Sequence, residues 1–237
     1  MLSIAHRGAS GITPENTRVA FVKALDLGAD MIEFDVQLTR DELPIIFHDE
    51  TLERTTNGSG RVGETDFATI SRLDAGSWFG ASFADHEVPT LEEVLGLLSG
   101  RVMLNIELKP DTRVEQLVRR VVTAVARFEL FQSVIFSSFH VGSLRSLRRL
   151  VPDARIGVLC QRGELPSALG IADELGAVAL HPAAAMVDTD LVREAHARKL
   201  SVYPWTVNEP GEIALLRALG IDGIFTDYPD RVARPRR

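Results

Sequence analysis

The fold class is decided by the stretch Met31-Ile32-Glu33-Phe34-Asp35-Val36-Gln37, in which apolar and polar side chains alternate. Successive side chains of a β-strand point to opposite faces of a sheet. One face of this strand is therefore apolar and suits packing beneath helices, whereas the other carries Glu33, Asp35 and Gln37. A strand with these two faces fits a barrel, whose interior receives every second side chain.

Residues 102–109 repeat the pattern, with Asn105, Glu107 and Lys109 on one face and apolar residues on the other. Buried carboxylates are costly unless a cation compensates them. Oxygen ligands without cysteine suit one divalent ion, Mg²⁺ or Ca²⁺, better than zinc. Simple pairing of the acids with Arg7 and Lys109 is the alternative, but the recurrence of the polar pattern on two strands, with histidines on two others, favours a metal site among these acids.

Short apolar runs alternate with amphipathic segments along the whole chain. Strands are predicted at 2–6, 31–38 with 43–48, 102–108, 133–137, 154–159, 177–180, 200–205 and 222–226. Helices are predicted at about 16–27, 90–98, 112–127, 140–150, 165–175, 188–198 and 209–218. About eight strand–helix units predict an α/β fold of the TIM (β/α)₈ barrel class. A doubly wound open sheet is the alternative, although no Gly-rich phosphate fingerprint follows the first strand.

Residues typical of helix ends support the predicted helices. Asn16 is predicted to cap the first helix, and Thr90 with Glu93 forms a capping box for the second. Glycine follows three of the predicted helices, at Gly28, Gly176 and Gly220.

Length and composition favour a single barrel domain over residues 1–237. The net charge of −7 argues against a nucleic-acid footprint and leaves a small anionic substrate for local cations to bind. No apolar run approaches the roughly 18 residues of a membrane span. A single cysteine, Cys160, and an N-terminus without a leader pattern predict a cytoplasmic protein. The oligomeric state stays open.

Residues 50–89 interrupt the alternation and predict an insertion, or cap, after the second strand. Long connections of this kind tend to be functional lids or small subdomains. Trp78, Phe79 and Phe83 are expected either to pack over the barrel mouth or to form a small cluster of their own.

Two histidines close apolar runs, and active sites of barrels lie at strand ends. His6, followed by Arg7, ends the first run, and His48, followed by Asp49, ends the run at 44–47. Two such histidines near carboxylates predict a general acid–base pair. His181 follows a later strand, where lining the mouth competes with a structural role.

Two later strand ends add candidate groups. Trp205 is predicted either to present an apolar platform to a small substrate or to pack under the loops. Asp227 is expected to cap or to form a salt bridge, near Arg7.

An ordered set of motifs resembles the glycerophosphodiester phosphodiesterase family over nearly the whole chain. The motifs are His6-Arg7-Gly8, Pro14-Glu15-Asn16-Thr17, Glu33 to Thr39, His48-Asp49, Val88 to Glu93, Asn105 to Lys109, Trp205 to Asn208 and Thr226 to Pro229. The resemblance implies a TIM barrel and metal-dependent hydrolysis of substrates such as glycerophosphocholine or glycerophosphoethanolamine to sn-glycerol 3-phosphate and an alcohol.

By motif, the resemblance also implies roles for individual residues. His6 and His48 would be the acid–base pair, and Arg7 and Lys109 would contact the phosphate. Glu33, Asp35 and Glu107 would bind the ion.

Two alternative functions each fit part of this pattern. A barrel similar to sphingomyelinase D would release a cyclic phosphate, but such a barrel is expected to carry a signal sequence and paired cysteines. A non-catalytic phosphoglycerol-binding barrel would need the cations but not two histidines at strand ends.

Overall fold

The computed structural model describes residues 1–232, and nine strands form its central sheet. The strands are β1 (Leu2–Ala5), β2 (Met31–Leu38), β3 (Pro44–Ile46), β4 (Met103–Leu108), β5 (Val134–Ser138), β6 (Ile156–Cys160), β7 (Ala179–Pro182), β8 (Ser201–Val202) and β9 (Gly223–Thr226). Their order is β8-β7-β6-β5-β4-β2-β1-β9, with β3 paired antiparallel to β2.

Eight of these strands run parallel and close on themselves. β1 pairs with both β2 and β9. Between the two outer strands of the path, the backbone N–H of Phe225 donates to Pro204 O at 2.9 Å and that of Asp222 donates to Val202 O at 3.2 Å. This closure confirms the TIM barrel and excludes the doubly wound open sheet.

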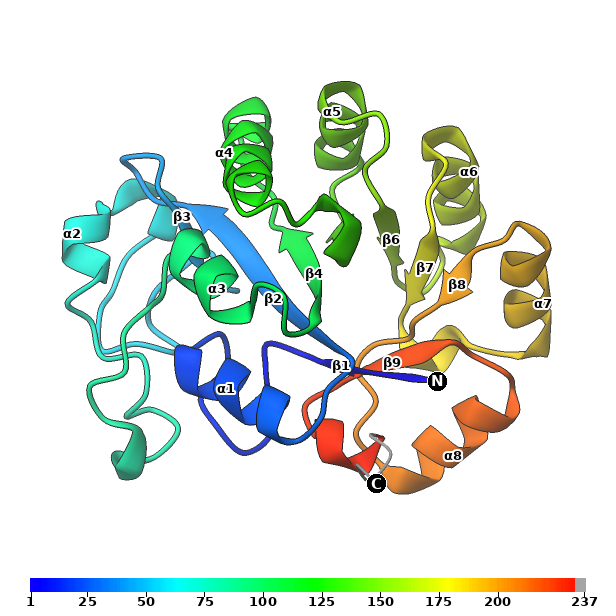
Figure 1. Cartoon of the computed structure of the whole chain (residues 1–237), viewed down its shortest axis with the longest axis horizontal. Coiled ribbons are helices and arrows are strands. Elements are labelled where there is room, and N and C mark those ends of the chain that lie inside the picture. The colour runs from blue at the N-terminus through cyan, green and yellow to red at the C-terminus, as the bar shows by residue number, and fades with distance from the viewer. Residues whose placement is uncertain (233–237) are drawn as a thin grey trace.

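Eight helices accompany the strands, and most of them surround the barrel (Figure 1). They are α1 (Arg18–Asp26), α2 (Phe67–Ile70), α3 (Leu91–Leu98), α4 (Val114–Arg127), α5 (Val141–Leu150), α6 (Leu165–Leu175), α7 (Thr189–Ala197) and α8 (Pro210–Ala218). Within residues 1–232, no helix has the length and apolar character needed to cross a membrane.

The two faces of β2 separate as the alternation predicts. Ile32, Phe34 and Val36 belong to the large core between the sheet and the helices, where Phe34 meets the Phe21 ring of α1 edge to face at 5.7 Å. Glu33 and Asp35 point into the barrel, although both are at most 3% exposed. β2 is thus buried on both faces, as barrel strands are.

The first helix begins one residue later than the capping prediction. Thr17 is its N-cap and accepts from the Ala20 N–H. Asn16 adopts a left-handed backbone conformation with φ of 57° instead, and its side chain binds Asp35. The capping box of Thr90 and Glu93 is confirmed.

The segment at 50–89 follows β3 and has its own apolar cluster. Leu52, Val62 and Ile70 pack with Ile45 and Phe47 in this cluster. The segment contains α2 and lies at the left of Figure 1.

The aromatic residues of this segment contact one another. Trp78 meets Phe79 edge to face, and Phe79 meets Phe83 in the same way. Of the two expectations, the structure supports a small cluster of their own, and Trp78 remains 40% exposed.

Gly8 fixes the approach of the β1–α1 loop to α1. Its φ is 85°, and a Cβ at this position would lie 2.6 Å from the Ala20 Cβ and 2.7 Å from the Ala20 carbonyl carbon. The loop that carries His6 and Arg7 therefore requires glycine here, both for conformation and for space.

We expect Gly8→Ala to lower the free energy of unfolding by more than about 2 kcal/mol, since the left-handed conformation alone costs about 1–2 kcal/mol and the contact with Ala20 adds to it. Gly100→Ala is the matched control, because Gly100 has φ of 70° and open space around a Cβ. Denaturant unfolding of both variants tests the point. Equal losses would show that the contact with Ala20 contributes nothing.

Candidate active site

A cavity of about 320 Å³ opens at the carboxyl ends of the barrel strands. One wall is polar and the other is mainly apolar. The lining residues are His6, Arg7, Glu33, His48, Asn105, Glu107, Lys109, Ser137, Phe139, Leu159, Gln161, Trp205 and Phe225. Seven of the eight site residues predicted from the sequence line this cavity; the eighth, Asp35, lies buried behind its polar wall.

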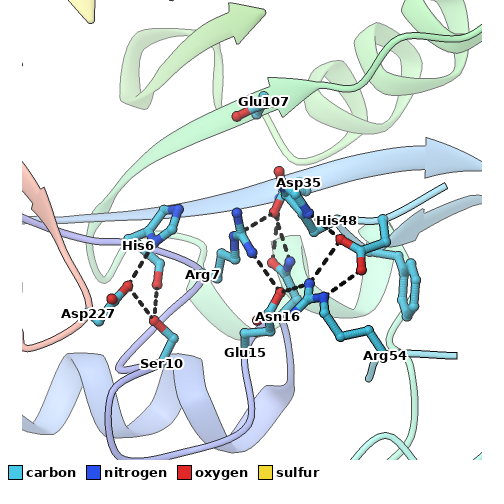
Figure 2. A network of polar contacts seen from close by, with 12 residues as sticks. His6, Arg7, Ser10, Glu15, Asn16, Asp35, His48, Arg54, Glu107 and Asp227 are labelled. Carbon is cyan, nitrogen blue, oxygen red and sulfur yellow. Dashed lines mark hydrogen bonds and ion pairs between the residues drawn. The ribbon is translucent and has the colours of Figure 1, made fainter. Parts of the chain in front are cut away.

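Three carboxylates meet in the barrel interior. Glu33 and Asp35 come from β2, and Glu107 comes from the neighbouring β4, where the register pairs it with Asp35. Each offers an oxygen, and these oxygens lie within 4.8 Å of one another. Figure 2 shows Glu107 and Asp35 projecting from the two adjacent strands.

Two cations lie beside this triad. Lys109 Nζ is 2.7 Å from Glu107 Oε1 and 3.4 Å from Asp35 Oδ1, and Arg7 Nε is 3.3 Å from Asp35 Oδ2. The pairing expected as the alternative to a metal site is therefore present. It does not balance the triad, because three carboxylates face two cations.

The pKa values of the acids follow from this imbalance. Burial, and then the charges of Asp35 and Glu107, raise the pKa of Glu33 well above its usual range. Burial and Asp35 likewise raise the pKa of Glu107. Burial also acts on Asp35, but Arg7 and Lys109 outweigh it and hold its pKa low. Arg7 and Lys109 therefore do not supply enough positive charge to keep Glu33 and Glu107 ionised in the ordinary range.

The triad fits a hard divalent cation. All three donors are carboxylate oxygens, which Mg²⁺ and Ca²⁺ prefer. Within residues 1–232, the buried Asp35 Oδ1 accepts no hydrogen bond, although the Lys109 ammonium lies 3.4 Å from it. An ion at this position would supply the charge that the triad lacks.

His6 is oriented by Asp227. Its Nδ1 lies 2.7 Å from Asp227 Oδ1, and the same carboxylate accepts from Ser10 Oγ and from Asn208 Nδ2. Burial on its own would raise the pKa of Asp227. The hydrogen bond from His6, followed by the other polar contacts, outweighs burial and lowers this pKa to about 2. Since an ionised carboxylate only accepts, His6 Nδ1 carries the proton and Nε2 is the ring nitrogen available to a ligand. Asp227 thus forms its salt bridge with His6, the residue that precedes Arg7.

His48 is held in the same way by its neighbour Asp49 through Nδ1. Burial lowers the pKa of His48, and the positive charges of Arg7 and Lys109 add to this effect although Asp35 opposes it. The sequence had indicated that His48 ends a barrel strand, and this prediction is wrong. It follows the antiparallel β3, which runs back along β2, where the Phe47 N–H donates to Asp35 O.

Arg7 is positioned by both its backbone and its side chain. Its φ is 54°, and its N–H donates to Glu33 Oε2 at 2.9 Å. Its Nη1 donates to Glu15 Oε1 at 2.8 Å. Three acids thus hold Arg7 in the polar wall, since Asp35 lies beside its Nε as well.

The facing wall is largely apolar. Phe139 and Trp205 meet edge to face at 5.4 Å, and Trp205 Nε1 donates to His181 O. His181 itself does not line the mouth, because β7 continues to Pro182 and places the ring inside the barrel between Tyr203 and Phe225. Its burial lowers its pKa to about 3, so it is neutral and structural.

Several residues of the site lack a pattern that identifies them in the sequence. Asn16 donates to Asp35 Oδ2 at 2.8 Å, and Arg54, from the insertion, binds both Glu15 and Asp49. The signal available in the sequence was the string Pro14-Glu15-Asn16-Thr17, which entered only through the family resemblance.

A cavity of this kind can exchange protons at two positions around a bound anion, with cations alongside. These are features that a TIM-barrel hydrolase of phosphate esters requires. A model of the Glycerophosphoryl diester phosphodiesterase family matches residues 6–231, and the chain belongs to this family of phosphoric diester hydrolases.

Individual relatives agree with the family match. A glycerophosphodiester phosphodiesterase of Caldanaerobacter subterraneus is 39% identical over 97% of this chain and 95% of its own. A phosphodiesterase of Oleispira antarctica, solved with the product sn-glycerol-3-phosphate, superimposes with a TM-score of 0.90 at 32% identity, over 97% of this chain and 94% of its own. A glycerophosphodiester phosphodiesterase of Agrobacterium tumefaciens gives 0.85 at 30% identity, over 98% of both chains.

The raised pKa of Glu33 gives the ion-free protein a pH dependence. The folded state keeps a proton that the unfolded chain loses near the ordinary pKa of glutamate, so this contribution to stability falls as the pH rises above that range. We expect Mg²⁺ or Ca²⁺ to raise the melting temperature, and to raise it more at pH 8 than at pH 5.5. At an ion concentration 100 times the dissociation constant, the free energy of unfolding rises by about 2.7 kcal/mol.

Glu33→Gln should raise the stability of the ion-free protein and remove most of the ion-dependent gain. Glu87→Gln, at an exposed position, is the control and should keep it. Differential scanning calorimetry with and without the ion measures both. An ion-dependent shift that Glu33→Gln leaves intact would place the ion elsewhere.

Proposed function

We propose that the protein hydrolyses glycerophosphodiesters, such as glycerophosphocholine or glycerophosphoethanolamine, to sn-glycerol 3-phosphate and an alcohol. The reaction depends on one divalent ion, Mg²⁺ or Ca²⁺, held by Glu33, Asp35 and Glu107. His6 and His48 act as the acid–base pair, and Arg7 and Lys109 contact the phosphate.

One observation carries this proposal. His6 and His48 line the same cavity, each is bound through Nδ1 to its own carboxylate, and a charge-deficient triad lies with them. A protein that only bound phosphoglycerol compounds would need the cations, but it would have no use for two histidines oriented in this way.

The two histidines perform complementary proton transfers. One accepts a proton at Nε2 from the attacking oxygen as that oxygen bonds to phosphorus. The P–O bond to the alcohol breaks, and the other histidine, protonated on both nitrogens, donates its Nε2 proton to the leaving oxygen. If the attacker is water, the product is glycerol 3-phosphate directly. If it is the neighbouring glycerol hydroxyl, a cyclic phosphate forms first, and water then opens it to glycerol 3-phosphate. Asp227 and Asp49 hold the rings in the tautomer that leaves Nε2 available.

The phosphodiester carries a negative charge that repels an attacking oxygen. The guanidinium of Arg7 and the ammonium of Lys109 stabilise the additional charge of the transition state, and both are less than one-fifth exposed. A bound divalent ion would supply Lewis-acid stabilisation of the phosphoryl oxygens.

The apolar wall fits the carbon skeleton of the glycerol. Trp205 and Phe139 present ring surfaces opposite the polar wall. We therefore assign Trp205 to substrate binding. The neighbour solved with sn-glycerol-3-phosphate supports glycerol 3-phosphate as the product that the cavity holds.

We expect His6→Ala and His48→Ala each to lower kcat by about 10²–10⁴-fold, since each removes one proton-transfer group. The assay couples glycerol 3-phosphate release to an indicator reaction over a panel of glycerophosphodiesters. His196→Ala is the control, because His196 pairs with Asp222 on the surface. Wild-type rates in either His6→Ala or His48→Ala would refute the assigned roles.

A chelator should abolish turnover, and Mg²⁺ or Ca²⁺ should restore it. Phosphorus NMR of the same reaction separates the proposal from cleavage of the sphingomyelinase D type. The expected final product is glycerol 3-phosphate. A cyclic phosphate that accumulates as the end product would favour the other reaction.

A further inference from the structure

Arg54 lies outside the cavity lining, yet its guanidinium joins two loops of the site. Nη1 and Nη2 donate to the two carboxylate oxygens of Glu15, each at 2.8 Å. Nε and Nη2 donate to the two oxygens of Asp49, the latter at 3.0 Å. One side chain from the insertion therefore binds two carboxylates in a bidentate manner, the geometry that a guanidinium permits and an ammonium does not.

Each of these carboxylates holds one residue of the cavity. Glu15 Oε1 accepts from Arg7 Nη1, and Asp49 Oδ1 lies against His48 Nδ1. A single carboxylate therefore separates Arg54 from Arg7, and another separates it from His48. Figure 2 shows the contacts from Arg7 through Glu15 to Arg54.

The arrangement differs from an ordinary surface ion pair. Exposed pairs contribute little, because water screens them and long side chains lose entropy. Arg54 is 44% exposed, but Glu15 is 13% exposed and Asp49 is 25% exposed. The Glu15 carboxylate accepts hydrogen bonds from both Arg7 and Arg54, and these two partners fix its position. The hydrogen bond from Arg54 is also the leading cause of the lowered pKa of Asp49, about 2.

We propose that Arg54 is a positioning residue that fixes Arg7 and His48 relative to each other through Glu15 and Asp49. The proposal rests on the proposed function for its kinetic consequence. The residues at 50–89 then contribute to the reaction by orientation, although their aromatic cluster does not line the cavity.

The kinetic test compares Arg54→Ala, Arg54→Lys and a matched control. Arg40→Ala is the control, because Arg40 also binds one carboxylate of the insertion, Asp66, through two nitrogens and contacts no cavity residue through it. We expect Arg54→Ala to lower kcat about 10–100-fold, as loss of an orienting partner typically does, with a smaller rise in KM. Arg54→Lys should recover only part of the loss.

The ion-dependent rise in melting temperature should persist in Arg54→Ala, since all three carboxylates of the triad remain and Arg54 contacts none of them. This readout separates a positioning role from general loss of structure. A kcat within twofold of wild type in Arg54→Ala, or an equal loss in Arg40→Ala, would overturn the proposal.

A second measurement does not require turnover. Nitrogen-15 NMR of the histidine rings reports the hydrogen bond at His48 Nδ1. The proposal predicts that the His48 signals shift or broaden in Arg54→Ala while those of His196 stay unchanged. Unaltered His48 signals would overturn it. Inactivity of the wild-type protein on every diester would instead count against the proposed function alone.

Discussion

The buried carboxylate of Asp35 is the constraint around which the site is built. It is 1% exposed, and it remains ionised because Arg7, Lys109 and Asn16 all lie against it. These partners come from the loop after β1 and from the end of β4. Holding one charge inside the barrel therefore fixes the relative positions of three chain segments, and the left-handed backbone at Arg7 and Asn16 is part of that arrangement.

The same burial leaves Glu33 and Glu107 short of positive charge. The protein keeps two acids in a place where their ionised forms are disfavoured, and a packed apolar interior would be the more stable alternative. This lack of positive charge has a functional explanation if a cation binds to the two acids, either with the substrate or before it. Both histidines have carboxylate partners outside the triad, since Asp227 and Asp49 orient the rings.

The sequence predicted the barrel and most of the cavity lining, because a two-residue period and helix caps are local signals. It could not predict contacts between distant segments, such as His6 with Asp227, 221 residues apart, or the two carboxylates bound by Arg54. Asn16 looked like a helix cap because asparagine favours both caps and left-handed turns. For His181 the sequence left two roles open, and the structural role holds because its strand extends two residues further than predicted, which moves the ring into the interior.

The most direct test of the account is a crystal structure with Mn²⁺ and sn-glycerol 3-phosphate, in which anomalous scattering locates the metal. Mn²⁺ accepts the same oxygen ligands as Mg²⁺. We expect one strong peak among Glu33, Asp35 and Glu107, with the phosphate between that peak and Arg7 and with His6 and His48 on either side. A peak at another position, or a phosphate bound away from both histidines, would contradict it.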